Sequence, residues 1–447
     1  MATTTHDRPV GHLLRVLGFA FAMAICVGTI IGGGILRTPG AVADRVPEPS
    51  IILLLWFLGG AHALLGANVV AEISTSVPKA GGLYVPTRRA FGDFAGLLVG
   101  WSDWLVNAAA AAALALVFAD FAALASPALA AHEPTLAGAV LITLFVLNWI
   151  GVREGGAIQT AGTLVKFALL IVLVVGLFVL VPEAVPQPAS APAPTWTVLG
   201  LVVAYQLVYG VFSGWPSPIF FVEEDEDSAR NIPRGMALSI LTVTAVYLAI
   251  NAALLHALPV QELRTSELPA AAALAKVLGA GSVQVIAAIA LVIVASCLNG
   301  VVMVLPRILY GLGRDGLFIS AATRVNKGGT PDIALALSAV LTLTLTLTGT
   351  FETVFLLMGG LVIFGMIISE ISLFALRRRE PDLPRPFRAI GYPILPILLL
   401  LIDTFLLVAV LVSDPMSGVY MFALVALSVP IGLWIRWRRT DVSVGAE

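Results

Sequence analysis

Residues 26–35 read CVGTIIGGGI and lie in the middle of the first long apolar stretch of the chain. Four of these ten residues are glycine, and three of the four are consecutive, at Gly32, Gly33 and Gly34. Each glycine destabilises a helix by about 1 kcal/mol relative to alanine. Close helix packing is the other explanation for glycine in an apolar helix, but three in succession remove the side chains that would pack. We therefore predict that the helix unwinds here.

A second interrupted stretch, residues 211–218, reads VFSGWPSP. Pro216 and Pro218 each remove a backbone donor and clash with the preceding turn, and Gly214 loosens the same place. Unwound backbone at membrane depth is tolerated only where protein or a water-filled cavity satisfies it. Two interrupted segments at matching positions, five spans apart, are typical of transporters built from inverted repeats, whose ligand site lies at the breaks.

Composition places both stretches in a membrane protein. Of the 447 residues, 59% are hydrophobic and 12% are charged, whereas a soluble domain carries roughly 25% charged residues. Twelve stretches read as membrane spans, of which the fourth and ninth are short. They are residues 17–36, 51–73, 95–124, 136–150, 157–181, 198–222, 236–258, 283–309, 333–347, 354–376, 394–412 and 418–435. We predict an all-α integral membrane protein with 12 transmembrane helices.

The expected fold is a five-plus-five inverted repeat with discontinuous helices 1 and 6, followed by two C-terminal helices. A Pro/Ala-rich stretch, PEAVPQPASAPAP, separates the two repeats. The predicted parts are a tail (1–16), the first repeat (17–181), an outer linker (182–197), the second repeat (198–376), a basic loop (377–393), the last two helices (394–435) and a second tail (436–447).

Basic residues set the orientation, because inner loops are enriched in Lys and Arg. With the N-terminus inside, 20 of the 25 basic residues fall in inner loops. The outer loops then hold only Arg37, Arg45, Arg264 and Lys276, and Lys166 lies within a span. Both termini are expected to be cytoplasmic, in the cell (inner) membrane. The polar residues before the first span predict no cleavable signal.

The broken helices suggest a ligand chemistry. A half-helix that begins near Gly33 and Gly34 presents free N–H groups and a positive dipole end, which suit an anion. Carbonyl groups released where the helices stop suit a cation. An α-amino acid, with adjacent carboxylate and ammonium groups, fits both, although a sodium ion and a separate carboxylate would satisfy the same geometry.

Lys166 lies about nine residues into the fifth span, hence roughly 14 Å into a ~30 Å hydrocarbon core. Its side chain is too short to reach the surface easily, and ionisable groups inside the membrane are usually functional. We predict a fixed cation or a proton-releasing switch. The alternative is that the span begins later and leaves Lys166 near the inner surface.

Other polar residues give weaker signals. Ser296 and Asn299, in the eighth span, are candidates to bond Lys166 or the freed backbone, or else to form a simple interhelix hydrogen bond. Glu223 and Glu224 follow the sixth span, and with Arg307 and Arg314 they are candidates for a cytoplasmic gate; a solvated charged loop is the alternative. Asp403 is expected to be structural or interfacial, and His62 receives no role. Cys26 and Cys297 lack metal-ligand spacing, so apolar packing is expected for both.

Several blocks of the sequence resemble the amino acid–polyamine–organocation (APC) superfamily of transporters, most closely its L-type-like and bacterial amino acid permease branches. The first block is the glycine-rich run at 28–36, with Leu36 where the family has Phe. The others are Ala71-Glu72, Pro78, Gly81-Gly82, Tyr84, Phe91-Gly92 and Gly100-Trp101; Ser213-Gly214-Trp215, Glu223-Glu224 and Arg230-Asn231-Ile232-Pro233-Arg234; and Asn299, Arg307 and Arg314-Asp315-Gly316. They follow the family order over residues 28–318.

The resemblance implies a LeuT-like fold and a substrate site. N–H groups near Gly32, Gly33 and Gly34 would hold the substrate carboxylate. Its ammonium would be held by the carbonyl groups of Ile30 in the first span and of Phe212, Ser213 and Trp215, which flank Gly214 in the sixth span. Trp215 would be an aromatic gate, and a lysine at the place of Lys166 replaces the sodium ion of sodium-coupled relatives. Gly33 stands where a small polar residue is usual, and the Pro216-Ser217-Pro218 run is unusual.

The expected function is therefore secondary active transport of amino acids, neutral ones by preference, by alternating access with proton coupling or exchange. The alternatives are an obligatory amino-acid antiporter, an amine or polyamine carrier, a membrane-embedded enzyme and a channel. An enzyme would need clustered His, Asp or Glu within the spans, and a channel needs no paired breaks. We expect an amino acid substrate, protons and the lipid bilayer as partners, with no nucleic acid, no cofactor, no metal and at most weak oligomers.

Overall fold

The computed structural model describes residues 13–181, 183–185, 196–348 and 351–444. Arg8 and most of the predicted 182–197 linker lie outside the described residues. Within the described part the secondary structure is helical, with two isolated bridges and no sheet. The first half contains α1 (Phe19–Ile30), α2 (Gly34–Arg45), α3 (Pro49–Ser76), α4 (Tyr84–Phe91), α5 (Asp93–Ala125), η1 (Pro127–His132), α6 (Glu133–Ile150) and α7 (Val152–Leu180).

The second half begins with the other interrupted segment. Its helices are α8 (Val198–Phe212), η2 (Ser217–Phe221), α9 (Ser228–Ala257), α10 (Val260–Thr265), α11 (Pro269–Leu278), η3 (Gly279–Gly281), α12 (Ser282–Arg314), η4 (Ser320–Thr323), α13 (Asp332–Thr348), α14 (Phe351–Arg379), α15 (Ile394–Ser413) and α16 (Pro415–Val444). Each of the twelve predicted spans corresponds to one of these helices or to a broken pair.

The two predicted breaks are present. Helices α1 and α2 meet at an angle of 45° across residues 31–33. Helix α8 ends at Phe212, and the chain resumes as the short 3-10 helix η2 at Ser217. The glycine run and the Pro216–Pro218 run therefore do interrupt their helices, as their backbone preferences require.

Length and composition agree with a multi-pass membrane protein. Counting only described residues, nine helices are long and apolar enough to cross a membrane, and the bent α1–α2 pair makes ten. The remaining two predicted spans are the shorter apolar helix α13 and the segment Gly418–Pro430 of α16. The predicted fourth span is longer than expected, because η1 extends α6 back to Pro127.

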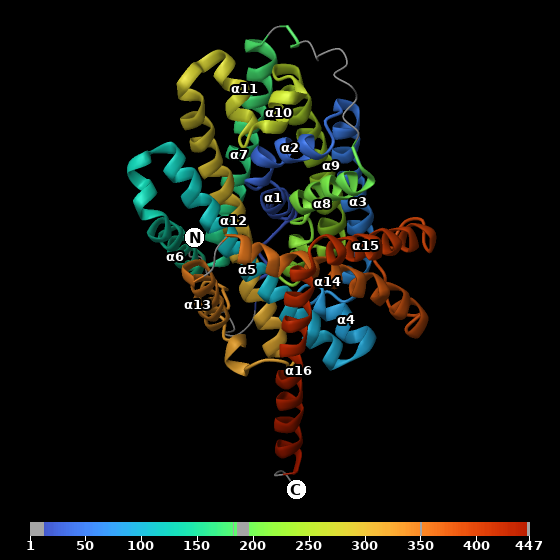
Figure 1. The fold of residues 1–447 in the computed structure, drawn as a ribbon. Coiled ribbons are helices and arrows are strands. Elements are labelled where there is room, and N and C mark those ends of the chain that lie inside the picture. Colours follow the sequence, from blue (N-terminus) through green and yellow to red (C-terminus); the bar gives the residue numbers. More distant parts are fainter. Residues whose placement is uncertain (1–12, 182, 186–195, 349–350, 445–447) are drawn as a thin grey trace, which may run out of the picture.

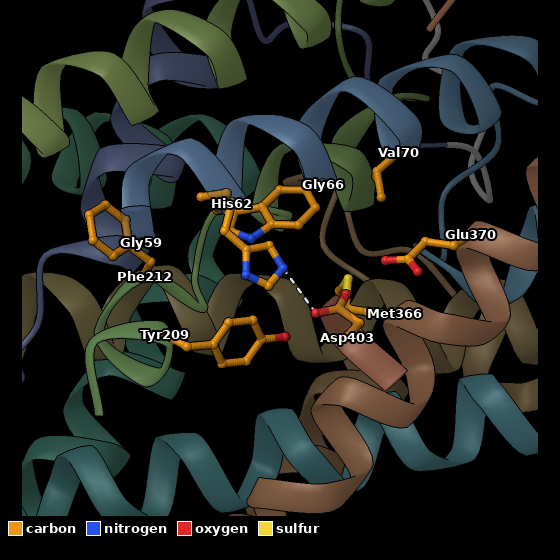
Figure 2. A pocket seen from close by; sticks show the side chains of 11 residues that line it. Gly59, His62, Gly66, Val70, Tyr209, Phe212, Met366, Glu370 and Asp403 are labelled. Carbon is orange, nitrogen blue, oxygen red and sulfur yellow. Dashed lines mark ion pairs between the residues drawn. The ribbon is translucent and has the colours of Figure 1, made fainter. Parts of the chain in front are cut away.

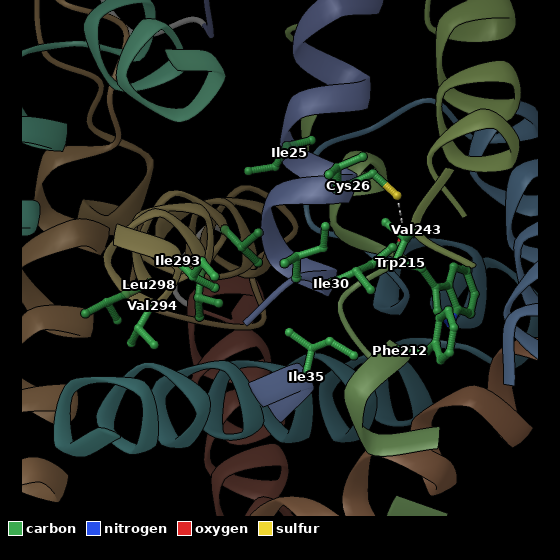
Figure 3. Packing of buried hydrophobic residues seen from close by; sticks show 14 of the residues in the cluster. Ile25, Cys26, Ile30, Ile35, Phe212, Trp215, Val243, Ile293, Val294 and Leu298 are labelled. Atoms are coloured by element: carbon green, nitrogen blue, oxygen red, sulfur yellow. Dashed lines mark hydrogen bonds between the residues drawn. The ribbon is translucent and has the colours of Figure 1, made fainter. Parts of the chain in front are cut away.

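Helix α1 lies at the centre of the molecule, among α7, α9 and α12 (Figure 1). Helix α12 packs along α5, and α3 packs along α9. Close approach at the centre depends on glycine: a β-carbon at Gly300 of α12 would lie 2.6 Å from the side chain of Thr29 in α1. The residues around the break form one buried apolar cluster that includes Ile25, Ile30 and Ile35 (Figure 3).

The outer helices face lipid with apolar side chains. On α7, Leu164, Val172 and Val179 are each about two-thirds exposed, while the opposite face, with Lys166 and Leu170, is fully buried. An exposed apolar stripe of this kind is suited to hydrocarbon rather than water. Helix α7 therefore shows lipid one face and presents its lysine to the centre of the bundle.

The basic residues predicted for the outer side lie on helices at one end of the molecule. Helices α2, α10 and α11 lie together at one end, at the top of Figure 1, and α4 lies toward the other. The four basic residues predicted for the outer side, Arg37, Arg45, Arg264 and Lys276, are carried by these three helices. Three of them are paired with acids: Arg264 with Asp44 at 3.3 Å, Lys276 with Glu262 at 2.7 Å and Arg37 with Asp120 at 3.6 Å.

Candidate functional site

The two helix breaks lie directly against each other. The hydroxyl of Thr29, in the last turn of α1, lies within hydrogen-bond distance of two carbonyls, that of Gly214 at 2.9 Å and that of Ile25 in its own helix at 2.7 Å. A β-carbon at Gly214 would overlap the backbone of Thr29, so only glycine fits there. Cys26 donates its thiol to the carbonyl of Trp215 at 3.4 Å (Figure 3). The structure thus brings residues about 185 positions apart into one unwound region.

The glycine run is enclosed by aliphatic and aromatic side chains from neighbouring helices. A β-carbon at Gly33 would lie 3.1 Å from Val117 of α5 and 3.2 Å from Val294 of α12. A β-carbon at Gly34 would lie 3.1 Å from Val211 of α8. Around Gly32 the nearest neighbour is Cys297, at 3.3 Å. None of these neighbours carries a charge.

Helix α2 begins at Gly34, immediately after the break. The first N–H groups of any helix have no partner within it and lie at the positive end of the helix dipole. Gly33 is the N-cap residue, and no side chain caps this end of the helix. The N-terminus of α2 is therefore suited to a carboxylate, and the absence of a β-carbon at Gly33 leaves the backbone open to close approach.

Three of the four carbonyl groups assigned to the ligand's ammonium, those of Ile30, Phe212 and Trp215, have partners within the chain. The Ile30 carbonyl accepts the hydroxyl of Tyr247 at 3.0 Å and the N–H of Gly32 at 3.0 Å. The Phe212 carbonyl accepts the N–H of Trp215 at 3.3 Å. The role of the Ile30, Phe212, Ser213 and Trp215 carbonyls in ammonium binding stays a prediction.

Trp215 lies on the α3 side of the break. Its ring packs against Gly66, where a β-carbon would lie 2.5 Å from the indole, and the side chain is 6% exposed. In this structure it faces α3 rather than the glycine run, and its role as an aromatic gate stays a prediction. The prolines nearby shape the chain locally, since the Pro216 carbonyl accepts the N–H of Ile219 as η2 begins.

Lys166 is the central residue of α7, with fourteen residues of the helix before it and fourteen after it. Its side chain is completely buried. The Nζ atom donates to the carbonyl of Gly28 at 2.5 Å and to the carbonyl of Ile31 at 2.9 Å. The lysine therefore caps carbonyls that α1 releases at its break. The middle of a 29-residue helix favours the mid-span position that the sequence predicts, and the coupling role of Lys166 stays a prediction.

Ser296 and Asn299 do not hydrogen bond to Lys166. The Asn299 amide donates to Gln159 of α7 at 2.9 Å and accepts from Asn148 of α6 at 2.8 Å. Gln159 in turn contacts the carbonyl of Ala24 in α1 at 3.4 Å. Asn299 is thus part of an interhelix network. The Ser296 hydroxyl has no hydrogen-bond partner within the described residues.

The acidic connector after η2 makes the two ion pairs that the sequence suggested. Glu224 forms a two-pronged pair with Arg307 of α12, with both oxygen–nitrogen distances at 2.9 Å and both side chains fully buried. Burial raises the pKa of the Glu224 carboxyl, and the guanidinium opposes that rise. Glu223 pairs with Arg314 at 2.8 Å, and this pair is partly exposed. Glu224 and Glu223 are therefore bound to α12, whereas Glu226 and Asp227 of the same connector are exposed; the role of the pairs as a cytoplasmic gate stays a prediction.

Some residues of the site gave no usable signal in the sequence. Tyr247, Gln159 and Thr163 sit in long apolar helices where a single polar residue is commonplace. Arg37 and Asp120 form a half-exposed pair at 3.6 Å between α2 and α5, with Arg37 over the ring of Phe121 at 4.8 Å. The basic character of Arg37 was visible, but its partner was not.

Comparison with known proteins gives a consistent result. The profile of a family described as amino acid permeases matches residues 17–439. The serine/threonine exchanger SteT of Bacillus subtilis is 30% identical over 434 residues, covering 94% of this chain and 95% of that protein. The human large neutral amino acids transporter small subunit 2 is 30% identical, with 94% and 80% covered. The human Asc-type amino acid transporter 1 is 30% identical, with 95% and 83% covered.

These relatives are transporters rather than enzymes. The match runs through both helix breaks and through the connector that carries Glu223 and Glu224. With its helical fold and its paired interruptions in α1–α2 and α8–η2, the chain belongs to the amino acid permease family of the APC superfamily.

Proposed function

We propose that the protein carries neutral amino acids across the membrane by alternating access, as an exchanger or a proton-coupled permease. The observation that carries this proposal is the contact between the two helix breaks, with Lys166 bound to the α1 carbonyls at the same place. At this contact the N-terminus of α2 is suited to the carboxylate of an amino acid, and the carbonyls released at the breaks are suited to its ammonium group. The names of the relatives, which transport or exchange amino acids, support the same substrate class.

The proposed preference for substrates with neutral side chains follows from the residues that surround the glycine run. Leu114, Val117, Val211 and Val294 are apolar, and a buried charge among them would lack a partner. A cationic substrate such as a polyamine would need a carboxylate near the break, and the side chains closest to Gly32, Gly33 and Gly34 include none. The amine-carrier alternative is therefore less well supported.

Uptake into proteoliposomes tests the proposal. We expect radiolabelled serine or leucine to accumulate faster when the vesicles are preloaded with an unlabelled neutral amino acid, or when an inward proton gradient is imposed. Faster uptake with preloading alone indicates exchange, and faster uptake with the gradient alone indicates proton coupling. Uptake of spermidine or lysine without uptake of any neutral amino acid would contradict the proposal.

We also propose the sidedness that the charge distribution favours, with both termini and α4 in the cytoplasm and α10–α11 outside, in the cell membrane. Thr265 on α10 and Ser320 on η4 are both exposed. In a background where Cys26 and Cys297 are replaced by alanine, a membrane-impermeant maleimide applied to intact cells should label Thr265→Cys and leave Ser320→Cys unlabelled. The reverse pattern would invert the topology.

A further inference from the structure

A cavity away from the glycine break is lined by one histidine and two carboxyl side chains (Figure 2). His62 comes from α3, Glu370 from α14 and Asp403 from α15. They are 5%, 2% and 2% exposed. All three helices qualify as membrane spans. Ionisable residues in such positions are rare and are usually functional.

Two of the three side chains are directly paired. His62 Nε2 lies 2.9 Å from Asp403 Oδ1, and His62 Nδ1 lies 2.8 Å from the hydroxyl of Tyr205 in α8. The ring of Tyr209, one turn further along α8, is 5.1 Å from the imidazole. One ring nitrogen of His62 is therefore hydrogen-bonded to Tyr205, and the other lies close enough to Asp403 that a protonated His62 would form an ion pair with its carboxylate.

Glu370 is the carboxyl group that does not take part in the His62–Asp403 ion pair. Its carboxyl projects into the cavity from α14 and interacts with that of Asp403. Its Oε2 atom has no hydrogen-bond partner in the described part of the chain, and neither has Asp403 Oδ1, although that oxygen lies 2.9 Å from the His62 ring. The remaining ionisable groups at the cavity are the neutral phenols Tyr205 and Tyr209, and no lysine or arginine belongs to the described residues that line it.

The net charge of His62, Glu370 and Asp403 indicates how many protons the cluster holds. With His62 protonated and both carboxyls ionised, the cavity would carry one uncompensated negative charge inside the membrane. An isolated charge there is strongly disfavoured. One additional proton on Glu370 makes the cluster neutral and supplies a hydrogen for the unsatisfied carboxyl oxygen.

We propose that His62, Glu370 and Asp403 form a second proton-binding site in the membrane, distinct from Lys166, in which Glu370 holds the exchangeable proton. A metal ion is a poor occupant, since no three His, Cys, Asp or Glu side chains among the described residues have the arrangement of a metal site. A sodium ion would need both carboxyls ionised, which gives the test a clear alternative.

The position of the site connects it to the broken sixth span. The same cavity is lined by Phe212, the last residue of α8, and by Trp215 in the segment between α8 and η2. Tyr205 on α8 also binds His62 directly. A movement of α8 relative to α3 would therefore change the surroundings of the proton, and by linkage the proton would bias the position of α8. This role in transport rests on the proposed function, whereas the proton occupancy does not.

Infrared difference spectroscopy of the full-length protein in lipid tests the occupancy directly. We expect a protonated-carboxyl C=O band that is present at neutral pH and is lost when the pH is raised. Glu370→Gln should remove the band, and Asp382→Asn, a matched change at an exposed acid in the loop after α14, should leave it. His62→Gln keeps both carboxyls, so it should shift the band instead of removing it. Asp403→Asn leaves Glu370 as the only carboxylate beside a protonated His62, so it should weaken the band.

Persistence of the full band in Glu370→Gln would overturn the proposal, and so would absence of the band from the unmodified protein. If the band is absent and the spectra change with sodium, the cavity is a sodium site instead. A second readout is the exchange rate in proteoliposomes against pH. Glu370→Gln should flatten the pH profile by about threefold or more relative to Asp382→Asn, and an unflattened profile would remove the link to transport. A protein that shows the band but transports no amino acid keeps the proton site and fails the proposed function instead.

Discussion

The ammonium group of Lys166 lies between two backbone oxygens of the broken helix, 2.5 Å from the Gly28 carbonyl and 2.9 Å from the Ile31 carbonyl. The helix break thereby places released carbonyls opposite a buried cation from α7. A cation in this position can fix the geometry of the break, and removal of the cation leaves two buried acceptors without a donor.

Lys166→Ala should therefore abolish concentrative amino acid uptake while the protein still reaches the membrane. We expect a loss of about tenfold or more, which corresponds to ~1.4 kcal/mol, because the α1 carbonyls lose their donor. Lys79→Ala, at an exposed lysine, is the matched control. Uptake by Lys166→Ala that equals the control under a proton gradient would exclude the coupling role.

Substitution of Gly33 should weaken amino acid binding. A β-carbon at Gly33 would lie within 3.2 Å of Val117 and Val294, so an added methyl group competes for space with both neighbours and with the ligand carboxylate. We expect Gly33→Ala to weaken binding by about tenfold and Gly33→Val by more, measured by thermal-shift titration with neutral amino acids. At Gly176 in α7 a β-carbon meets nothing within 4 Å, and Gly176→Ala should bind normally. Equal affinities for the two alanine variants would refute the carboxylate site.

The buried pair between Glu224 and Arg307 should behave differently from the partly exposed pair between Glu223 and Arg314. Removal of one partner of a buried pair leaves an uncompensated charge and destabilises by roughly 3–5 kcal/mol. An exposed pair contributes about 1 kcal/mol or less. We expect Glu224→Gln to lower the unfolding temperature strongly and Glu223→Gln to lower it slightly.

A double variant separates stability from gating at the buried pair. Glu224→Gln combined with Arg307→Met removes both charges and should recover much of the lost stability. If the pair is the cytoplasmic gate, transport by the double variant stays impaired although the fold is restored. Normal transport by a stable double variant would reduce the pair to a structural contact.

Glu72 in α3 anchors the loop between α14 and α15. Its carboxylate is 1% exposed, accepts from Arg377 at 2.5 and 2.8 Å and from the N–H of Ala389 at 2.6 Å, and lies 3.3 Å from Arg385. Glu72→Gln removes the charge that holds these groups. We expect faster tryptic cleavage after Arg388 in the variant than in the unmodified protein.

Asp382→Asn, in the same loop, is the control for this cleavage assay. Asp382 is exposed, so its substitution should leave the rate of proteolysis unchanged. A cleavage rate for Glu72→Gln that matches this control would show that the loop is held by other contacts.

The helix breaks were predictable from the sequence because their causes are local. Three consecutive glycines and two closely spaced prolines disfavour a helix wherever they occur. The mid-span position of Lys166 was predictable for a similar reason, since the length of an apolar stretch fixes depth. The exact ends were not: α2 continues to Arg45, nine residues past the predicted end of the first span.

The partners of polar residues were not predictable, because they depend on how helices rotate and pack. Asn299 was a candidate partner for Lys166, yet it bonds Gln159 and Asn148. His62 and Asp403 are 341 positions apart and each looks isolated in its own apolar helix. Only the packing of α3 against α15 brings them to 2.9 Å.

Tyr247 has a consequence for affinity under the proposed binding mode. Its hydroxyl already occupies the Ile30 carbonyl that a substrate ammonium would use. The protein therefore carries its own competitor for the ligand site, and substrate binding replaces one hydrogen bond with another instead of adding one. Such an exchange keeps the net free energy of binding small, and a carrier that must release its cargo on the far side of the membrane needs affinity of that modest kind.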